Sequence, residues 1–236
     1  VGKEALESGY AAAEELSDTL YEQQHKERAK AAGAWFEAEK AKLAEGARLN
    51  LGEPFELFES ASDQARDECA FHDITVASFY LGLSIYDDVV EGALFATGRP
   101  LALISKFAPD RKLSDLTITL AYKPSPPMLH AQWHALPLLK IAKRVLLACA
   151  PEGAEPSRDS VNRFKAYLGE HRVKAEVHTL PKGKDAAQEM EKFHLAQNAD
   201  LLVMGAYSHS RLRQLVFGGF TEHFLDAKTC NLFLSH

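Results

Sequence analysis

The sequence has few cysteines and no long apolar run. Its three cysteines, Cys69, Cys149 and Cys230, are scattered without CxxC spacing. This pattern argues against a disulfide framework or a structural zinc site and is typical of reduced thiols. No run of about 18 apolar residues is free of charged or polar breaks, and the first residues are acidic where a signal peptide would be basic and then apolar. We therefore expect a cytoplasmic protein without a membrane span.

The sequence also lacks the motifs of common catalytic sites. It contains no GxSxG, no GxxxxGK[ST], no HExxH and no nucleophile with a partnered base. It lacks a dense Lys/Arg patch with interleaved aromatic residues, so a nucleic-acid partner is not expected. His130 and His134 share a helix face, but no Glu or Cys stands near them at useful spacing, so packing or surface roles are favoured over metal binding. We expect no dedicated catalysis and no metal site.

The charge is unevenly distributed along the 236 residues. Residues 1–112 carry 12 Lys and Arg against 21 Asp and Glu, whereas residues 113–236 carry 15 against 12. Eight of the ten histidines lie in the second part. An anionic ligand is therefore expected in the second part of the chain. The overall composition, with 46% hydrophobic and 25% charged residues, predicts a globular chain.

The second part shows a regular alternation of apolar runs and amphipathic segments. Strands are predicted at 116–122, 144–150, 173–180, 201–205 and 232–234, and helices at 128–142, 158–170, 185–197 and 213–225. Because neighbouring parallel strands need crossover connections, this alternation predicts an α/β doubly wound domain with an open parallel sheet.

The first part is less regular. A long amphipathic helix is predicted from about residue 3 to residue 43, followed by a strand at 55–59 and a short helix capped by Ser62. A strand at 73–78, a helix at about 86–96 and a strand at 101–104 complete it.

An internal repeat relates the two parts. The segment Asp73-Ile-Thr-Val-Ala-Ser-Phe-Tyr80 aligns without gaps with Asp200-Leu-Leu-Val-Met-Gly-Ala-Tyr207. Before its helix the second copy has Gly218-Gly219, where the first has the acidic pair Asp87-Asp88. Carboxylates at a helix start repel an anion, so the second copy is the one predicted to accept phosphate.

The segment after the fourth strand resembles the nucleotide loop of the universal stress protein family. Family members that bind nucleotide carry Gly, two residues, Gly, nine residues, then Gly and Ser or Thr. Here Gly205 fills the first position, Ser208 replaces the second glycine, Gly218 fills the third, and Gly219 replaces the hydroxyl residue. Thr221 stands two residues later.

The resemblance implies two tandem Rossmann-like repeats forming a pseudo-dimer, with strand order 3-2-1-4-5 in the second. It implies a degenerate domain at 1–112, which lacks the initial strand, helix and strand of its twin, and a complete domain at 113–236. The closing strands, Leu101–Ile104 and Leu232 to Leu234, would pair edge to edge, as in the family's dimers. Whether two copies form a homodimer is left open.

The resemblance also implies ATP or AMP as ligand, with or without Mg²⁺, in a stress-response or regulatory role. The aspartate that usually ends the first strand is replaced by Lys123, which cannot accept hydrogen bonds from a ribose. The implied nucleotide-binding residues are Ala121, Tyr122, Lys123, Ala148, Met204, Gly205, Ser208, His209, Gly218, Gly219, Phe220 and Thr221. The alternatives are a protein-interaction scaffold that binds no nucleotide and a slow ATP hydrolase.

Overall fold

A computed structural model describes isolated positions between residues 23 and 41, and then residues 61–79, 90, 92–104, 112–150, 157–182, 185–206 and 219–236. The chain divides into two compact units, Val1–Phe58 and Glu59–His236. In the first unit the described positions from Gln23 to Ala38 are helical, in agreement with the long helix predicted there. The strand predicted at 55–59 lies outside the described residues. Within the described residues, no helix is long and apolar enough to cross a membrane.

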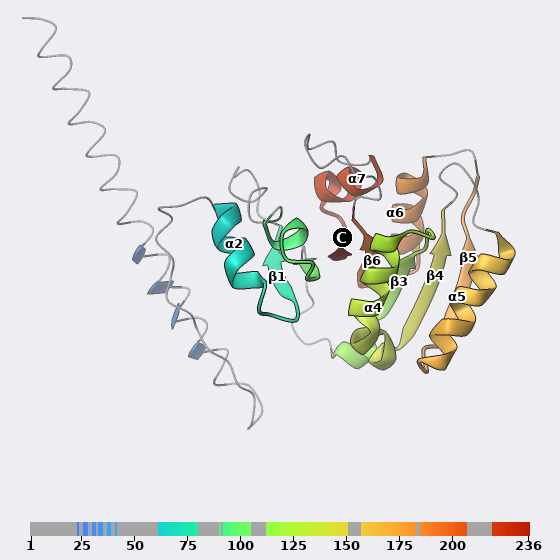
Figure 1. The fold of residues 1–236 in the computed structure, drawn as a ribbon, viewed down its shortest axis with the longest axis horizontal. Coiled ribbons are helices and arrows are strands. Elements are labelled where there is room, and N and C mark those ends of the chain that lie inside the picture. The colour runs from blue at the N-terminus through green and yellow to red at the C-terminus, as the bar shows by residue number, and fades with distance from the viewer. Residues whose placement is uncertain are drawn as a thin grey trace, which may run out of the picture. The chain divides into compact units, whose positions relative to one another are not determined.

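The second unit contains a sheet in which seven strands are described (Figure 1). Its order is β1-β2-β7-β6-β3-β4-β5, and the β2–β7 pair is antiparallel while the other neighbours are parallel. The order of the last five strands is the predicted 3-2-1-4-5 order. The bounds are β1 Thr75–Ser78, β2 Leu101–Ile104, β3 Thr117–Ala121, β4 Arg144–Cys149, β5 Ala175–Thr179, β6 Leu201–Gly205 and β7 Leu232–Ser235.

The helices follow the predicted alternation with two differences at their starts. The described helices of this unit include α2 Ala61–Cys69, α4 Pro126–Ile141, α5 Arg158–Glu170, α6 Ala186–Ala196 and α7 Gly219–Ala227. Ser62 lies inside α2, so its predicted role as the N-cap is wrong. The helix predicted at 213–225 is described only from Gly219 onward. Asp185 caps α6, because its carboxylate accepts hydrogen bonds from the amides of Ala187 and Gln188.

The sheet is covered on both faces over its central strands. Because β3, β4 and β5 follow one another in one direction, right-handed crossovers place α4 and α5 on one face, and the reversal to β6 places α6 and α7 on the other. One core accordingly contains Met128, Ala135 and Phe164 from α4 and α5, and the other contains Met190 and Phe224 from α6 and α7. Every residue of β3 is buried, as expected for a central parallel strand.

The two sequence repeats are related in the sheet by a pseudo-twofold axis. Thr75 of β1 pairs with Leu101 of β2, as its counterpart Leu202 of β6 pairs with Leu232 of β7. The closing strands then pair with each other, as predicted. The division into domains at residue 112 is not tested by this arrangement and stays a prediction.

Candidate functional site

The candidate site lies at the carboxyl ends of β3 and β6. The chain leaves β3 toward β4 on one side, whereas β6 pairs with β3 on the other side, so the strand order reverses between β3 and β6. In open α/β sheets, ligands bind outside the carboxyl ends of the strands at such a reversal. The structure therefore brings Lys123, after β3, and Gly205, at the end of β6, to the same edge of the sheet.

Gly205 is required by the packing of α4. A Cβ atom at this position would lie 2.4 Å from the amide nitrogen of Met128 and 2.6 Å from the carbonyl carbon of Pro127. Backbone atoms cannot approach a Cβ so closely, so the first turn of α4 can rest on β6 only where the side chain is missing. The sequence interpretation assigned this glycine to ligand approach and missed its contact with the helix.

The first turn of α4 offers few free amides to an anion. Pro126 and Pro127 occupy the first positions of the helix, and proline has no N–H group. The stretch from residue 116 to residue 151 also contains no Asp or Glu. A nucleotide at this edge would therefore have no carboxylate after β3 to accept hydrogen bonds from its ribose hydroxyls. It would also have fewer backbone N–H groups at the start of α4 than a helix without prolines offers.

Four of the predicted site residues form the buried floor of the site. Tyr122 is 5% exposed, its ring stacks on Phe164 at a centroid distance of 4.5 Å, and its hydroxyl lies 2.8 Å from the Ser160 hydroxyl. Its amide donates to the carbonyl of Ala148, which is fully buried. Ala121 and Met204 are buried as well. These residues support the edge of the sheet from within the core.

The N-terminal end of α7 supplies a more open wall. Gly219, its first residue, is exposed, and a Cβ atom there would meet nothing within 4 Å. Phe220 is half-buried and contacts Phe224, whereas Thr221 is only 4% exposed. The predicted site residues Ser208, His209 and Gly218 lie outside the described residues.

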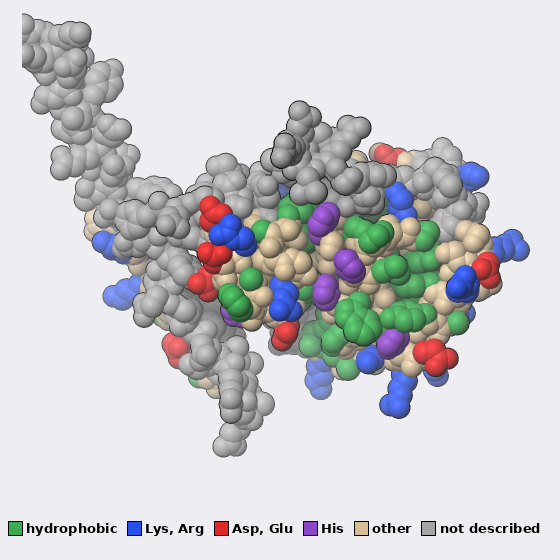
Figure 2. Space-filling model, viewed as in Figure 1, with side chains coloured by type: hydrophobic (Ala, Val, Ile, Leu, Met, Phe, Trp, Pro, Cys, Tyr) green, Lys and Arg blue, Asp and Glu red, His purple; other side chains and the backbone are tan. Residues whose placement is uncertain are grey.

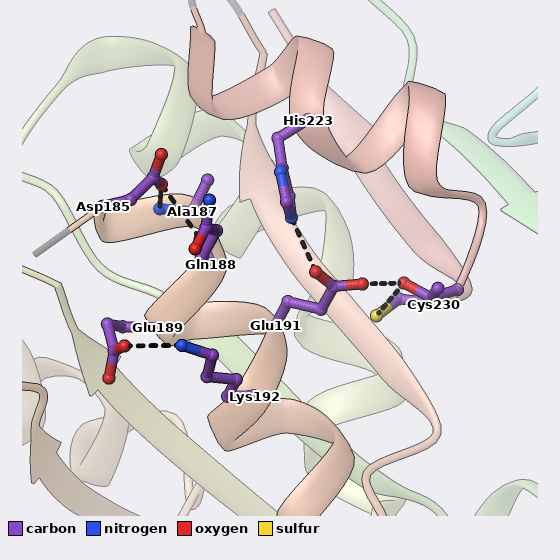
Figure 3. A network of polar contacts seen from close by, with 9 residues as sticks. Asp185, Ala187, Gln188, Glu189, Glu191, Lys192, His223 and Cys230 are labelled. Carbon is purple, nitrogen blue, oxygen red and sulfur yellow. Dashed lines mark hydrogen bonds and ion pairs between the residues drawn. The ribbon is translucent and has the colours of Figure 1, made fainter.

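A polar network fixes α7 to α6 beside this wall (Figure 3). A carboxylate oxygen of Glu191 on α6 lies 2.7 Å from Nε2 of His223 on α7, and its other oxygen accepts a hydrogen bond from the hydroxyl of Thr229. Burial raises the pKa of Glu191, but the hydrogen bonds from Thr229 and His223 outweigh it and the net shift is downward. Burial raises the pKa of the neighbouring Cys230 thiol, which makes it a poor nucleophile. The network thus has a structural role.

His194 of α6 is a buried polar residue between this helix and the sheet. It is 1% exposed, and its Nδ1 atom lies 3.1 Å from the hydroxyl of Thr119 in β3. Burial lowers its pKa to about 4, so the ring is neutral near pH 7. A neutral, solvent-excluded imidazole that contacts a core threonine holds α6 against the sheet.

His130 and His134 contact the C-terminal residues. Nδ1 of His134 lies 3.0 Å from the hydroxyl of Ser235, and Nδ1 of His130 lies 3.0 Å from the carbonyl oxygen of His236. Figure 2 shows histidine side chains gathered next to hydrophobic ones on this face. Burial, and to a lesser degree the electrostatic influence of the nearby His130 and Arg99 side chains, lowers the pKa of His134. In the part of the chain that the structure describes, no group of three or more His, Cys, Asp or Glu residues could hold a metal ion.

The fold and the strand reversal define a Rossmann-like α/β protein. No family model and no curated protein matches the sequence. Among solved structures, a universal stress protein from Archaeoglobus fulgidus DSM 4304 is similar, with a TM-score of 0.58 at 15% identity over 74% of this chain and 64% of that one. The chain thus spans less than two thirds of the length of that protein.

Two structures from Pseudomonas aeruginosa are also similar. A putative universal stress protein from strain UCBPP-PA14 has a TM-score of 0.54 at 13% identity, over 87% of this chain and 77% of that one. A protein of unknown function from strain PAO1 has a TM-score of 0.55 at 14% identity with the same coverage. The chain therefore has the fold of universal stress proteins, which confirms the resemblance at the level of the fold.

Proposed function

We propose that the chain is a universal stress protein whose second repeat binds an adenine nucleotide, ATP or AMP, in a regulatory role without dedicated catalysis. The observation that carries the proposal is the reversal of strand order between β3 and β6, because ligands of open α/β sheets bind outside the carboxyl ends of the strands at such a reversal. Gly219 is exposed and has no atom within 4 Å of a Cβ position, and Lys123 follows the end of β3 at the same edge of the sheet.

The proposed recognition depends on phosphate more than on ribose. With no carboxylate between residues 116 and 151, the ribose hydroxyls have no charged acceptor at the end of β3. The phosphates, in contrast, would meet Lys123, the open first turn of α7 and the sequence motif residues Ser208, His209 and Gly218. AMP should therefore bind more weakly than ATP, and Mg²⁺ would act through the phosphates.

The proposal is tested by calorimetric titration of ATP and AMP. Compared with the natural sequence, a variant with Gly218→Val and Gly219→Val should bind ATP at least tenfold more weakly, because β-branched side chains would fill the space that we propose for the phosphates. Gly169→Ala is the matched control, since a Cβ at this exposed glycine of α5 also meets nothing within 4 Å. Equal ATP affinity of the double variant and the control would contradict the proposal.

A second candidate is an interaction scaffold of the same fold that binds no nucleotide. It is favoured by the prolines at the start of α4, which remove amide donors, and by the missing carboxylate. The absorbance ratio at 260 and 280 nm of the purified protein, with mass spectrometry after denaturation, separates the candidates. Nucleotide that copurifies in stoichiometric amount supports the first candidate. A protein free of nucleotide that also fails the ATP titration supports the second.

A further inference from the structure

The chain leaves β6 through Ala206, whose main chain is bonded to the end of β7. Ala206 is fully buried, and its carbonyl oxygen lies 3.1 Å from Nδ1 of His236. A carbonyl oxygen can only accept, so Nδ1 of His236 carries the proton and donates it. The amide of Ala206 donates to the carbonyl of Ser235 at 2.8 Å. Both polar groups of the Ala206 main chain are therefore satisfied by two consecutive residues.

The position of His236 is itself fixed by contacts with both repeats. Its ring meets the ring of Phe95 edge-on, with 5.1 Å between the centroids. Its main-chain carbonyl accepts a hydrogen bond from Nδ1 of His130 on α4 at 3.0 Å. Phe95 belongs to the first repeat and α4 to the second. The imidazole that contacts Ala206 is therefore held by side chains from both parts of the sequence.

Ala206 immediately precedes the segment that carries the sequence motif of the proposed nucleotide site. The residue before it, Gly205, is packed against the first turn of α4, and Ser208 follows two residues after it. The main-chain direction at Ala206 therefore sets where the segment 207–218 begins. Groups that are already in place bind a ligand more tightly than groups that must be ordered on binding.

We propose that His236 is a positioning residue for the nucleotide site, because it holds the main chain at Ala206 from which the motif segment starts. This inference rests on the proposed function and adds to it a residue outside the sequence motif. His236 acts through Ala206 and not by contact with the nucleotide. Without a donor at position 236 the buried carbonyl of Ala206 would lose its hydrogen bond, and the main chain would shift to regain one.

Two variants separate the N–H donor of His236 from its ring. His236→Phe keeps a ring beside Phe95 but has no donor, whereas His236→Asn loses the ring and offers an N–H the same number of bonds from Cα. His171→Phe is the matched control, because the ring of His171 also contacts an aromatic ring, that of Tyr167 at 4.7 Å. His171 follows α5 and precedes β5, so it lies at the opposite edge of the sheet from the proposed site.

Calorimetric titration of ATP into each full chain measures the effect on the site. His236→Phe should weaken ATP binding about fivefold, which corresponds to the loss of one hydrogen bond. His236→Asn and His171→Phe should remain within about twofold of the natural sequence. Thermal unfolding verifies that each variant is folded, which is expected because His236 is exposed.

Hydrogen exchange measures the effect on the main chain without any nucleotide. The amide of Ala206 exchanges only when its hydrogen bond to Ser235 opens. In NMR spectra of the isotope-labelled chain, His236→Phe should raise the exchange rate of this amide about fivefold, because the neighbouring carbonyl has lost its donor. His236→Asn should restore the slow exchange of the natural chain.

The outcomes distinguish this inference from the proposed function. ATP binding by the natural chain with equal affinity of His236→Phe would overturn the inference and leave the proposed function standing. Weaker binding without faster exchange at Ala206, or without recovery in His236→Asn, would also overturn it. A natural chain that binds no ATP would overturn both. Weaker ATP binding and faster exchange in His236→Phe, both reversed in His236→Asn, would support the positioning role.

Discussion

Ala102 of β2 lies directly opposite Phe233 of β7 at the centre of the antiparallel pair that joins the two repeats. The two residues are counterparts, so the pseudo-twofold axis passes between them, and yet one is small and the other large. Both are buried in the same core. The pair thus sets one large and one small buried side chain against each other across the axis.

Phe233→Ala should lower the free energy of unfolding by about 3–5 kcal/mol, because it leaves a cavity beside the small Ala102. Urea denaturation followed by circular dichroism measures the change. Val177→Ala, at an exposed position of β5, is the control and should change stability little. A decrease in the free energy of unfolding of less than about 1 kcal/mol for Phe233→Ala would show that the contact between β2 and β7 is not tightly packed.

Gly205→Ala should destabilise the chain by about 1–3 kcal/mol, because the new Cβ would force the first turn of α4 away from β6. Gly169→Ala is the matched control. It places the same methyl group in open space inside α5, so it should stabilise the protein by about 0.5–1 kcal/mol. Chemical denaturation of both variants measures the difference, and equal effects would contradict the assigned packing role of Gly205.

The buried His194 should make stability fall with acid. Because its pKa is about 4 in the folded chain and near 6.5 when unfolded, the unfolded state binds more protons between these values. The free energy of unfolding should therefore drop by up to about 3 kcal/mol from pH 6.5 to pH 4. His194→Gln should flatten this part of the curve. An unchanged pH dependence in the variant would show that another group is responsible.

Glu191 and His223 should be energetically coupled. In a double-mutant cycle, Glu191→Gln and His223→Gln should give a coupling energy of about 0.5–3 kcal/mol, because the two side chains share a hydrogen bond in a half-buried site. Since the pKa of Glu191 is depressed, the coupling should be present at pH 7 and lost as the pH falls through its folded value. Additive effects of the two substitutions would argue against the contact.

Much of the fold could be predicted because, in the second repeat, the local sequence pattern and the observed helices and strands agree. Apolar strands such as Leu201–Gly205 and the amphipathic helix Arg158–Glu170 have bounds set by local pattern and capping, and the predicted and observed bounds agree. The strand order needed the family resemblance, because a local pattern does not tell which strands become neighbours. The edge-to-edge pairing of the closing strands came from the same source.

The candidate site was harder to predict because its residues serve two purposes. A glycine at the end of a strand indicates that a ligand or another segment of backbone lies close to it. Only the three-dimensional structure shows that the segment next to Gly205 is the first turn of α4. Likewise the sequence does not reveal that Tyr122 turns into the core to stack on Phe164. In the sequence, the adjacent prolines Pro126 and Pro127 mark the start of the helix that contacts Gly205.

The place of β7 inside the sheet has a consequence during synthesis. β7 lies between β2 and β6, both of which leave the ribosome earlier. Until residues 232–235 emerge, a nascent chain carries two unpaired strand edges, and such edges promote aggregation. Insertion of β7 pairs it with β2, which is far away in the sequence, and is therefore slow. Chains that stop before residue 232 should depend on chaperones more strongly than chains that contain β7.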